Sequence, residues 1–136
     1  MTPTSLETRV RVRYAETDQM GVVYHAHYLV WMEVGRVELC RASGFRYRDL
    51  EQDGILMAVV EANCRYLAPA LYDDEVVIRT RIETANARVV RFAYEMDAAH
   101  DGHRLAEGYT VHVFCGPNRR AAKLPEKYHA VFGIGE

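Results

Sequence analysis

The segment from Tyr14 to Tyr28 contains the residues whose types and spacing best suit catalysis. Asp18 is a carboxylate that could attack a carbonyl carbon or remove a proton from water, and His25 follows seven residues later. An aspartate placed before a helix is also a common turn or capping residue. Its position alone therefore does not identify a reaction.

Two other sets of residues could suggest metal chemistry. His25 and His27 are two positions apart, and on a helix such side chains do not face each other. The three cysteines, Cys40, Cys64 and Cys115, are an odd number at unrelated spacings, which does not indicate a zinc site or a disulfide framework. We expect the cysteines to be small buried hydrophobic residues, and we expect neither a bound metal nor a cofactor.

The element that must position Asp18 and His25 is a helix predicted over residues 25–42. This range has no proline and no period-2 alternation, and its apolar residues spread around most of a helical wheel, so we expect it to be largely buried. Ser43-Gly44 would end the helix. Gly35 in its middle costs about 1 kcal/mol against alanine, and a close approach to the sheet or to a partner subunit would compensate.

Alternating apolar and polar residues predict strands in the rest of the chain, with one apolar face running from Leu56 to Tyr66. Pro125 is predicted to open a short closing helix. We interpret residues 1–136 as one α+β domain, in which a five-stranded antiparallel sheet wraps around one long central helix. The last four strands are expected in meander order, and exposed strand edges predict pairing with a second copy. The expected strands are 7–14, 56–66, 76–83, 90–97 and 104–115.

Composition narrows the classes of partner. The chain has 136 residues, 49% of them hydrophobic and 26% charged, with a formal net charge of −2. This balance gives no electrostatic reason to expect a nucleic acid or an anionic membrane surface. The first residues lack the pattern of a signal peptide, and no apolar run is long enough to span a membrane. We therefore expect a cytoplasmic protein without integral membrane association.

The run Asp18-x-x-Gly21-Val22-Val23-Tyr24-His25 resembles the hotdog-fold thioesterases of the 4-hydroxybenzoyl-CoA thioesterase type. Within them it is most similar to the bacterial branch associated with the Tol-Pal gene cluster. The resemblance continues through Tyr66-x-Ala68-Pro69-Ala70 and Leu124-Pro125. It implies a hotdog fold and an acyl-CoA thioesterase whose active sites lie at a dimer interface, with dimers often paired into tetramers.

Carried over residue by residue, the resemblance implies that Asp18 is the catalytic carboxylate and that His25 and Tyr14 assist it. A backbone N–H near Tyr24 or His25, at the start of the helix, would polarise the thioester carbonyl. His25 could instead be a structural histidine that holds the loop, and Tyr14 could be a packing residue of its strand. Whether Asp18 acts as nucleophile or as general base is left open.

A basic loop after the last predicted strand supplies a second candidate contact with the substrate. Arg119, Arg120 and Lys123 could bind the phosphates of CoA, or they could form a solvated surface loop. The acyl group is not identified by the sequence. An acyl-carrier-protein thioesterase and a non-catalytic hotdog binding or interaction protein are the alternatives, whereas the histidine and carboxylate pattern of hotdog dehydratases is absent.

Overall fold

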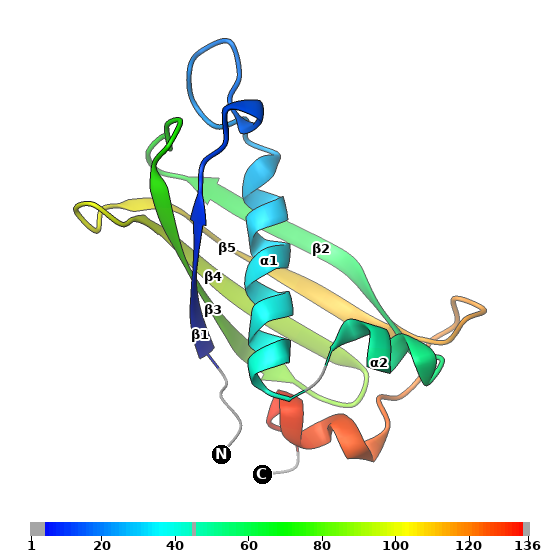
Figure 1. The fold of residues 1–136 in the computed structure, drawn as a ribbon. Coiled ribbons are helices and arrows are strands. Elements are labelled where there is room, and N and C mark those ends of the chain that lie inside the picture. The colour runs from blue at the N-terminus through cyan, green and yellow to red at the C-terminus, as the bar shows by residue number, and fades with distance from the viewer. Residues whose placement is uncertain (1–4, 45, 135–136) are drawn as a thin grey trace.

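The computed structural model describes residues 5–44 and 46–134, which are organised around one five-stranded antiparallel sheet (Figure 1). The strand order is β1-β3-β4-β5-β2, so β1 and β2 form the two edges. Along each strand, alternate residues face either the helix side or the outer side of the sheet. The strands are β1 (Ser5–Arg11), β2 (Leu56–Tyr66), β3 (Glu75–Ala85), β4 (Val89–Ala98) and β5 (Arg104–Cys115).

One helix, α1 (His27–Ala42), crosses the inner face of this sheet (Figure 1). The expectation of a long helix surrounded by the sheet is wrong in two respects. The helix has 16 residues and begins two positions later than expected, and its outward face is open, with Leu29 41% and Val30 48% exposed. The sheet covers only one side of a helix, so burial follows a single stripe: Tyr28, Trp31, Met32, Gly35, Arg36, Leu39 and Cys40.

Gly35 lies where α1 approaches the sheet most closely. A Cβ atom at this position would overlap Thr80 Oγ1 and would lie 3.0 Å from Ile78 Cγ2. Both side chains come from β3, directly beneath the helix. The expected close approach of the helix to the sheet is confirmed.

The predicted meander is wrong for β2. Only β3, β4 and β5 follow one another as neighbours, because β2 pairs with β5 at one edge and β1 pairs with β3 at the other. The chain between β2 and β3 does not form a hairpin. It crosses the end of the sheet, where Ala70 O accepts from Val23 N at 2.9 Å and Asp74 O accepts from Val12 N at 2.8 Å. These bonds tie the crossing segment to the loop that precedes α1.

A bulge changes which residues of β2 share a face. Val59 pairs with His112 and Glu61 pairs with Val111, so Val60 is an extra residue in the ladder. The extra residue reverses the alternation, and the single apolar face expected from Leu56 to Tyr66 is therefore wrong. Sequence alternation alone does not reveal an inserted residue.

Three short helical segments complete the described chain. The sequence did not predict η1 (Tyr14–Glu16) or α2 (Tyr47–Gln52). The predicted closing helix is η2 (Glu126–Phe132), a 3-10 helix with Pro125 at its N-cap. Within residues 5–44 and 46–134, no helix is both long enough and apolar enough to cross a membrane.

Candidate active site

The loop before α1 holds Asp18 at the first position of a tight turn. Gly21 N donates to Asp18 O at 3.0 Å, and Asp18 N donates to Val22 O at 2.9 Å. Gly21 has a φ of 79°, a conformation that glycine adopts without strain. Met20 N also donates to the carboxylate oxygen Oδ1 of Asp18 at 2.8 Å. One carboxylate oxygen is thus fixed by the turn, and the half-buried side chain is held in place.

Beneath this turn, Glu16 is 4% exposed and connects both ends of the loop. Its Oε1 accepts from Arg13 N at 2.7 Å, and its carbonyl oxygen accepts from Tyr24 N at 2.8 Å. Burial alone would raise the pKa of Glu16, but the hydrogen bonds and charge of Arg13, with a further bond from Trp31, outweigh burial and hold this pKa below its usual value. Glu16 therefore remains a carboxylate that fixes the loop.

The start of α1 bears on the expected oxyanion donors. Tyr24 N already donates to Glu16 O, which argues against Tyr24 as the donor. The N–H of His25 has no acceptor among the described residues. The carbonyl of His25 is held from two directions, by Tyr28 N at 3.3 Å and by Tyr66 Oη at 2.9 Å. His25 therefore combines a fixed backbone with an available N–H, and it lies just before the positive end of α1, which begins at His27.

Asp18 and His25 line one open groove of about 350 Å³ between the loop, the start of α1 and the end of β2. The structure thus brings together two of the three predicted catalytic residues. Tyr14 is outside this lining; its side chain is 76% exposed and packs edge-on against Tyr72, with ring centroids 5.4 Å apart. The groove is lined by Asp18, Val22, Val23, His25, Tyr28, Tyr66, Leu67, Ala68 and Pro69.

Tyr66 and Tyr28 form an aromatic wall of the groove that the sequence did not assign to the site. Their ring centroids are 5.1 Å apart, and the Tyr66 ring also meets the His25 ring edge-on. Tyr28 Oη accepts from Ala70 N at 3.3 Å. Partial burial, together with Cys64, raises the pKa of Tyr66 to about 12, so its hydroxyl stays protonated and can donate. The sequence did contain a signal for Tyr66, the Tyr66-x-Ala68-Pro69 motif of the family resemblance, but no functional role was assigned to that motif.

The predicted CoA-binding residues are not part of this groove. Arg119, Arg120 and Lys123 lie in the loop after β5, whose last residue, Cys115, pairs with Leu56 at the start of β2. The groove lies at the other end of β2, and the orange and blue loops in Figure 1 are correspondingly far apart. Within one protomer the structure therefore does not bring these basic residues to Asp18.

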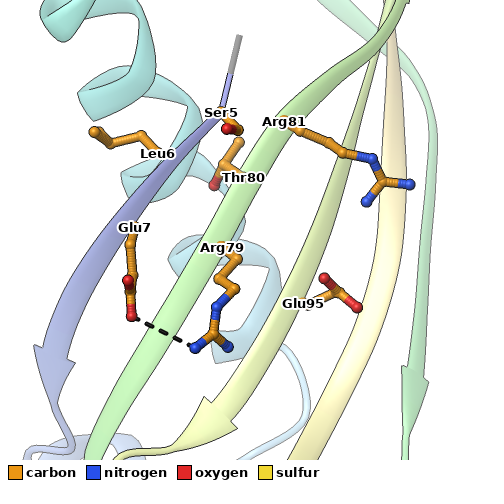
Figure 2. Close-up of a pocket in the computed structure, with 7 residues that line it drawn as sticks. All are labelled: Ser5, Leu6, Glu7, Arg79, Thr80, Arg81 and Glu95. Atoms are coloured by element: carbon orange, nitrogen blue, oxygen red, sulfur yellow. Dashed lines mark ion pairs between the residues drawn. The ribbon is translucent and has the colours of Figure 1, made fainter. Parts of the chain in front are cut away.

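A larger hollow of about 420 Å³ lies over the start of β1 and the middle of β3 (Figure 2). Its charges are mixed, and Arg79 forms an ion pair with Glu7 at 3.5 Å. The lining contains no histidine, cysteine or aromatic residue, and the hollow holds no constellation suited to attack on a carbonyl. It is lined by Ser5, Leu6, Glu7, Arg79, Thr80, Arg81 and Glu95.

The three cysteines do not offer an alternative nucleophile. All three are free thiols; Cys40 and Cys115 are buried, and Cys64 is half-buried. Burial raises the pKa of Cys40 to about 12 and also raises the pKa of Cys64. Both thiols are therefore protonated and unreactive near neutral pH.

The chain is similar in sequence and in fold to known thioesterases. Among curated sequences, YneP, a candidate acyl-CoA thioesterase of Bacillus subtilis, is 49% identical over 87 residues, which are 64% of this chain and 63% of YneP. YbgC, an acyl-CoA thioester hydrolase of Escherichia coli, is 38% identical over 82 residues, or 60% of this chain and 61% of YbgC. The sequence matches thus span less than two thirds of these relatives.

A solved structure extends the likeness to nearly the whole chain. The DHNA-CoA thioesterase from Staphylococcus aureus superposes with a TM-score of 0.91 and 28% identity, covering 95% of this chain and 89% of that one. The fold is accordingly the hotdog thioesterase fold. Residues 12–132 match the family model described as the thioesterase-like superfamily, and the chain belongs to that superfamily.

Proposed function

We propose that this protein is an acyl-CoA thioesterase that hydrolyses the thioester to a free carboxylic acid and CoA. The observation that carries the proposal is the groove that the half-buried carboxylate of Asp18 shares with His25, two residues before α1 begins at His27. The names of the relatives YneP and YbgC support the same reaction. We place the chain closest to the Tol-Pal-associated branch on the strength of its Asp18-to-His25 motif.

In this mechanism Asp18 acts in one of two ways. As a general base it takes a proton from water, the resulting hydroxide attacks the carbonyl carbon, and the carbon–sulfur bond breaks. As a nucleophile its free oxygen forms a mixed anhydride, CoA leaves as a thiolate, and water then hydrolyses the anhydride. A thiol has a pKa of about 8.5, so the thiolate leaves with less help from an acid than an alkoxide would need.

The developing negative charge on the carbonyl oxygen requires a donor. The N–H of His25 is our candidate, because it has no acceptor among the described residues and the helix dipole favours negative charge there. The His25 imidazole lines the same groove and assists in orienting the thioester. The assisting role of Tyr14 stays a prediction, because its ring packs against Tyr72 and is not part of the groove lining.

We propose that the working enzyme is a cytoplasmic homo-oligomer, a dimer or a dimer of dimers. The outer edge of β2 pairs with no strand among the described residues, and Val59 and Val60 on it are 50% and 58% exposed. A second copy on this edge would remove the unpaired backbone groups from water. In such an assembly, Arg119, Arg120 and Lys123 of a neighbouring protomer are the candidates for binding the CoA phosphates.

Thiol release measures the proposed activity directly. Purified protein is expected to liberate free thiol from members of a panel of short, medium-chain and aromatic acyl-CoAs. Asp18→Asn is expected to reduce this release by at least about 10²-fold while the protein stays folded. Failure on every acyl-CoA and every acyl-carrier-protein thioester would sink the hydrolase proposal. Wild-type rates from a folded Asp18→Asn variant would sink only the assignment of Asp18.

The same panel separates the alternatives. Turnover confined to acyl-carrier-protein thioesters would identify a carrier-protein thioesterase. Binding of acyl-CoA without turnover, measured by calorimetry, would instead identify a non-catalytic binding protein with the same fold. The ranking of acyl groups would define the specificity.

A further inference from the structure

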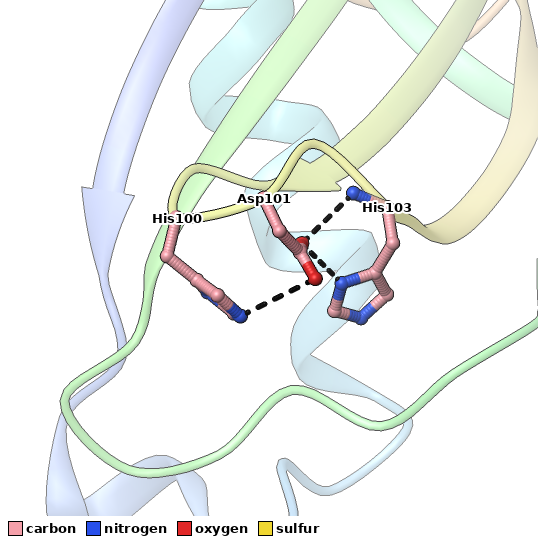
Figure 3. A group of neighbouring side chains, drawn as sticks. All are labelled: His100, Asp101 and His103. Atoms are coloured by element: carbon pink, nitrogen blue, oxygen red, sulfur yellow. Dashed lines mark hydrogen bonds and ion pairs between the residues drawn. The ribbon is translucent and has the colours of Figure 1, made fainter.

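A second cluster of chemically active side chains lies outside the groove, on the turn between β4 and β5. His100, Asp101 and His103 come from four consecutive positions, and one ligand atom from each lies within 4.8 Å of the others (Figure 3). All three side chains are open to solvent, with exposed fractions of 63%, 52% and 43%. We propose that this turn binds a divalent transition-metal ion of the zinc class, which the reaction does not use.

Two distances between candidate ligand atoms lie on either side of the spacing that such an ion requires. Bonds of about 2.0–2.2 Å from zinc to nitrogen and oxygen place neighbouring ligands of a tetrahedron roughly 3.4 Å apart. His100 Nε2 lies 3.6 Å from Asp101 Oδ2. His103 Nδ1 lies 2.5 Å from Asp101 Oδ1, a hydrogen bond whose proton the ion would replace. We expect rotation of these exposed side chains to bring both distances to about 3.4 Å.

The backbone of the turn is already organised for this arrangement. Ala98 N donates to His103 O at 2.9 Å, and Gly102 N donates to Ala98 O at 2.8 Å. Gly102 has a φ of 77°, which closes the turn without strain. His103 N donates to Asp101 Oδ1 at 3.0 Å and so orients the carboxylate toward the imidazole rings. Little conformational freedom would be lost on binding.

The ligand types favour a borderline metal over calcium or magnesium. Two imidazoles and one carboxylate suit Zn²⁺, Co²⁺, Ni²⁺ or Cu²⁺, whereas hard cations prefer oxygen ligands. Three protein ligands leave coordination positions for water. Because all three are exposed, we expect micromolar affinity and not the tight binding of a closed structural site.

The surrounding charges do not oppose a cation. His100 borders a hollow that also contains Arg9 and Arg11 of β1 and three carboxylates from the preceding loop and β3. Both arginines are paired, since each contacts the carboxylate of Glu75, at 2.7 and 3.1 Å. The other two carboxylates belong to Asp73 and Asp74.

The proposal is tested with tag-free, chelator-treated protein. Calorimetric titration with Zn²⁺ is expected to show one ion bound per chain at neutral pH. His100→Ala and His103→Ala are each expected to weaken binding at least about tenfold, since even the loss of an outer-shell partner costs that much. Co²⁺ is expected to develop visible absorption bands in the wild type that both variants lose.

His129→Ala is the matched control, because His129 bonds to Leu124 O and lies far from the turn in sequence. It is expected to bind Zn²⁺ as the wild type does. Unchanged binding in both turn variants, or the absence of micromolar binding in the wild type, would overturn the proposal and leave a hydrogen-bonded turn only. Thiol release by metal-free protein is expected to equal that of the zinc-loaded protein, so this test is independent of the proposed hydrolase activity.

Discussion

Two turns in this chain are built alike and are expected to do different chemistry. In the turn before α1, Asp18 Oδ1 accepts from Met20 N, and in the turn between β4 and β5, Asp101 Oδ1 accepts from His103 N. Each turn contains a glycine with positive φ, Gly21 or Gly102. Each also has histidine nearby. Local sequence therefore specifies the same aspartate-centred turn twice.

The difference lies in what surrounds each turn. Asp18 is half-buried, and it shares an apolar groove with the start of a helix. Asp101 is exposed on a hairpin, and its partners are imidazoles from the same turn. A carboxylate beside an apolar groove and a helix N-terminus can act on a carbonyl, whereas an exposed carboxylate between imidazoles can act as a metal ligand. Tertiary surroundings, and not the turn itself, decide between the two.

The largest expected effect comes from neutralising Asp18 and Asp101 in separate variants, which tests whether the two turns differ in function. Asp18→Asn is expected to lower kcat/KM by roughly 10²–10⁴-fold, the usual contribution of acid–base catalysis. Asp101→Asn is expected to leave kcat/KM unchanged and to weaken Zn²⁺ binding. Thiol-release kinetics and calorimetry on both variants check the pair. Equal losses of activity would show that the two turns are not functionally distinct.

A second test removes the carboxylate that supports only the Asp18 turn. Glu16→Gln is expected to lower the free energy of unfolding by about 1.5–3 kcal/mol at pH 7, because a buried charged acceptor is lost. The folded-state pKa of Glu16 lies below its ordinary value of 4.5. Its contribution is therefore complete above that value and is lost as the pH falls through the lower folded-state pKa.

Urea unfolding at neutral and acidic pH measures this effect. As the pH falls below about 4.5, the ordinary pKa of Glu16, the free energy of unfolding is expected to fall less for Glu16→Gln than for the wild type. Asp49→Asn is a suitable control, since Asp49 makes the same kind of capping contact with Arg46 on the surface. Parallel acid profiles for Glu16→Gln and the wild type would contradict the role given to Glu16.

The two glycines allow a matched test of coupling between turn and groove. Gly21→Ala and Gly102→Ala are each expected to lower the free energy of unfolding by roughly 1–2 kcal/mol, because alanine is strained in the left-handed region. A Cβ atom at either position would meet no heavy atom within 4 Å, so the cost is conformational in both cases. Only Gly21→Ala is expected to lower kcat, as it displaces Asp18. An equal effect on kcat would remove the distinction.

The smallest expected effect concerns the start of α1. Tyr66→Phe removes the hydroxyl that donates to His25 O. Its loss is expected to raise the activation free energy of thioester hydrolysis by about 0.5–1.5 kcal/mol, the net contribution of one hydrogen bond. We expect this loss mainly in kcat, with KM little changed, because the bond orients the proposed oxyanion donor. Tyr109→Phe is the control, since it loses one hydroxyl bond, to Glu61, outside the groove. A wild-type kcat for Tyr66→Phe would exclude this orienting role.

Much of the fold could be predicted because periodicity is a local property. The antiparallel sheet of five strands, the stop of α1 near Ser43 and the need for close approach at Gly35 all followed from residue types and spacing. The position of β2 beside β5 could not be predicted. Strand order depends on which segments cross the end of the sheet, and alternation carries no information about that. The bulge at Val60 could not be predicted either, because alternation does not reveal how a strand pairs with its neighbour.

The candidate site divides in the same way. The motif containing Asp18 and His25 placed both residues in one short segment, and the fold brings both to one groove. The role of Tyr66 depended on a contact across 41 positions of sequence. Neither the separation of Arg119 and Arg120 from Asp18 nor the engagement of Tyr24 N with Glu16 could be predicted without the fold.

The sequence by itself determined the elements and the motif, because helix and strand periods, turn glycines and capping residues act over a few positions. Only the tertiary structure decided that one aspartate-centred turn lies beside a groove and a helix start while the other stands in solvent among histidines. The physical reason is that the burial of a side chain, the electrostatic field around it and the geometry of its neighbouring ligands depend on groups that are distant in the chain. Those groups meet only when α1 packs on the sheet.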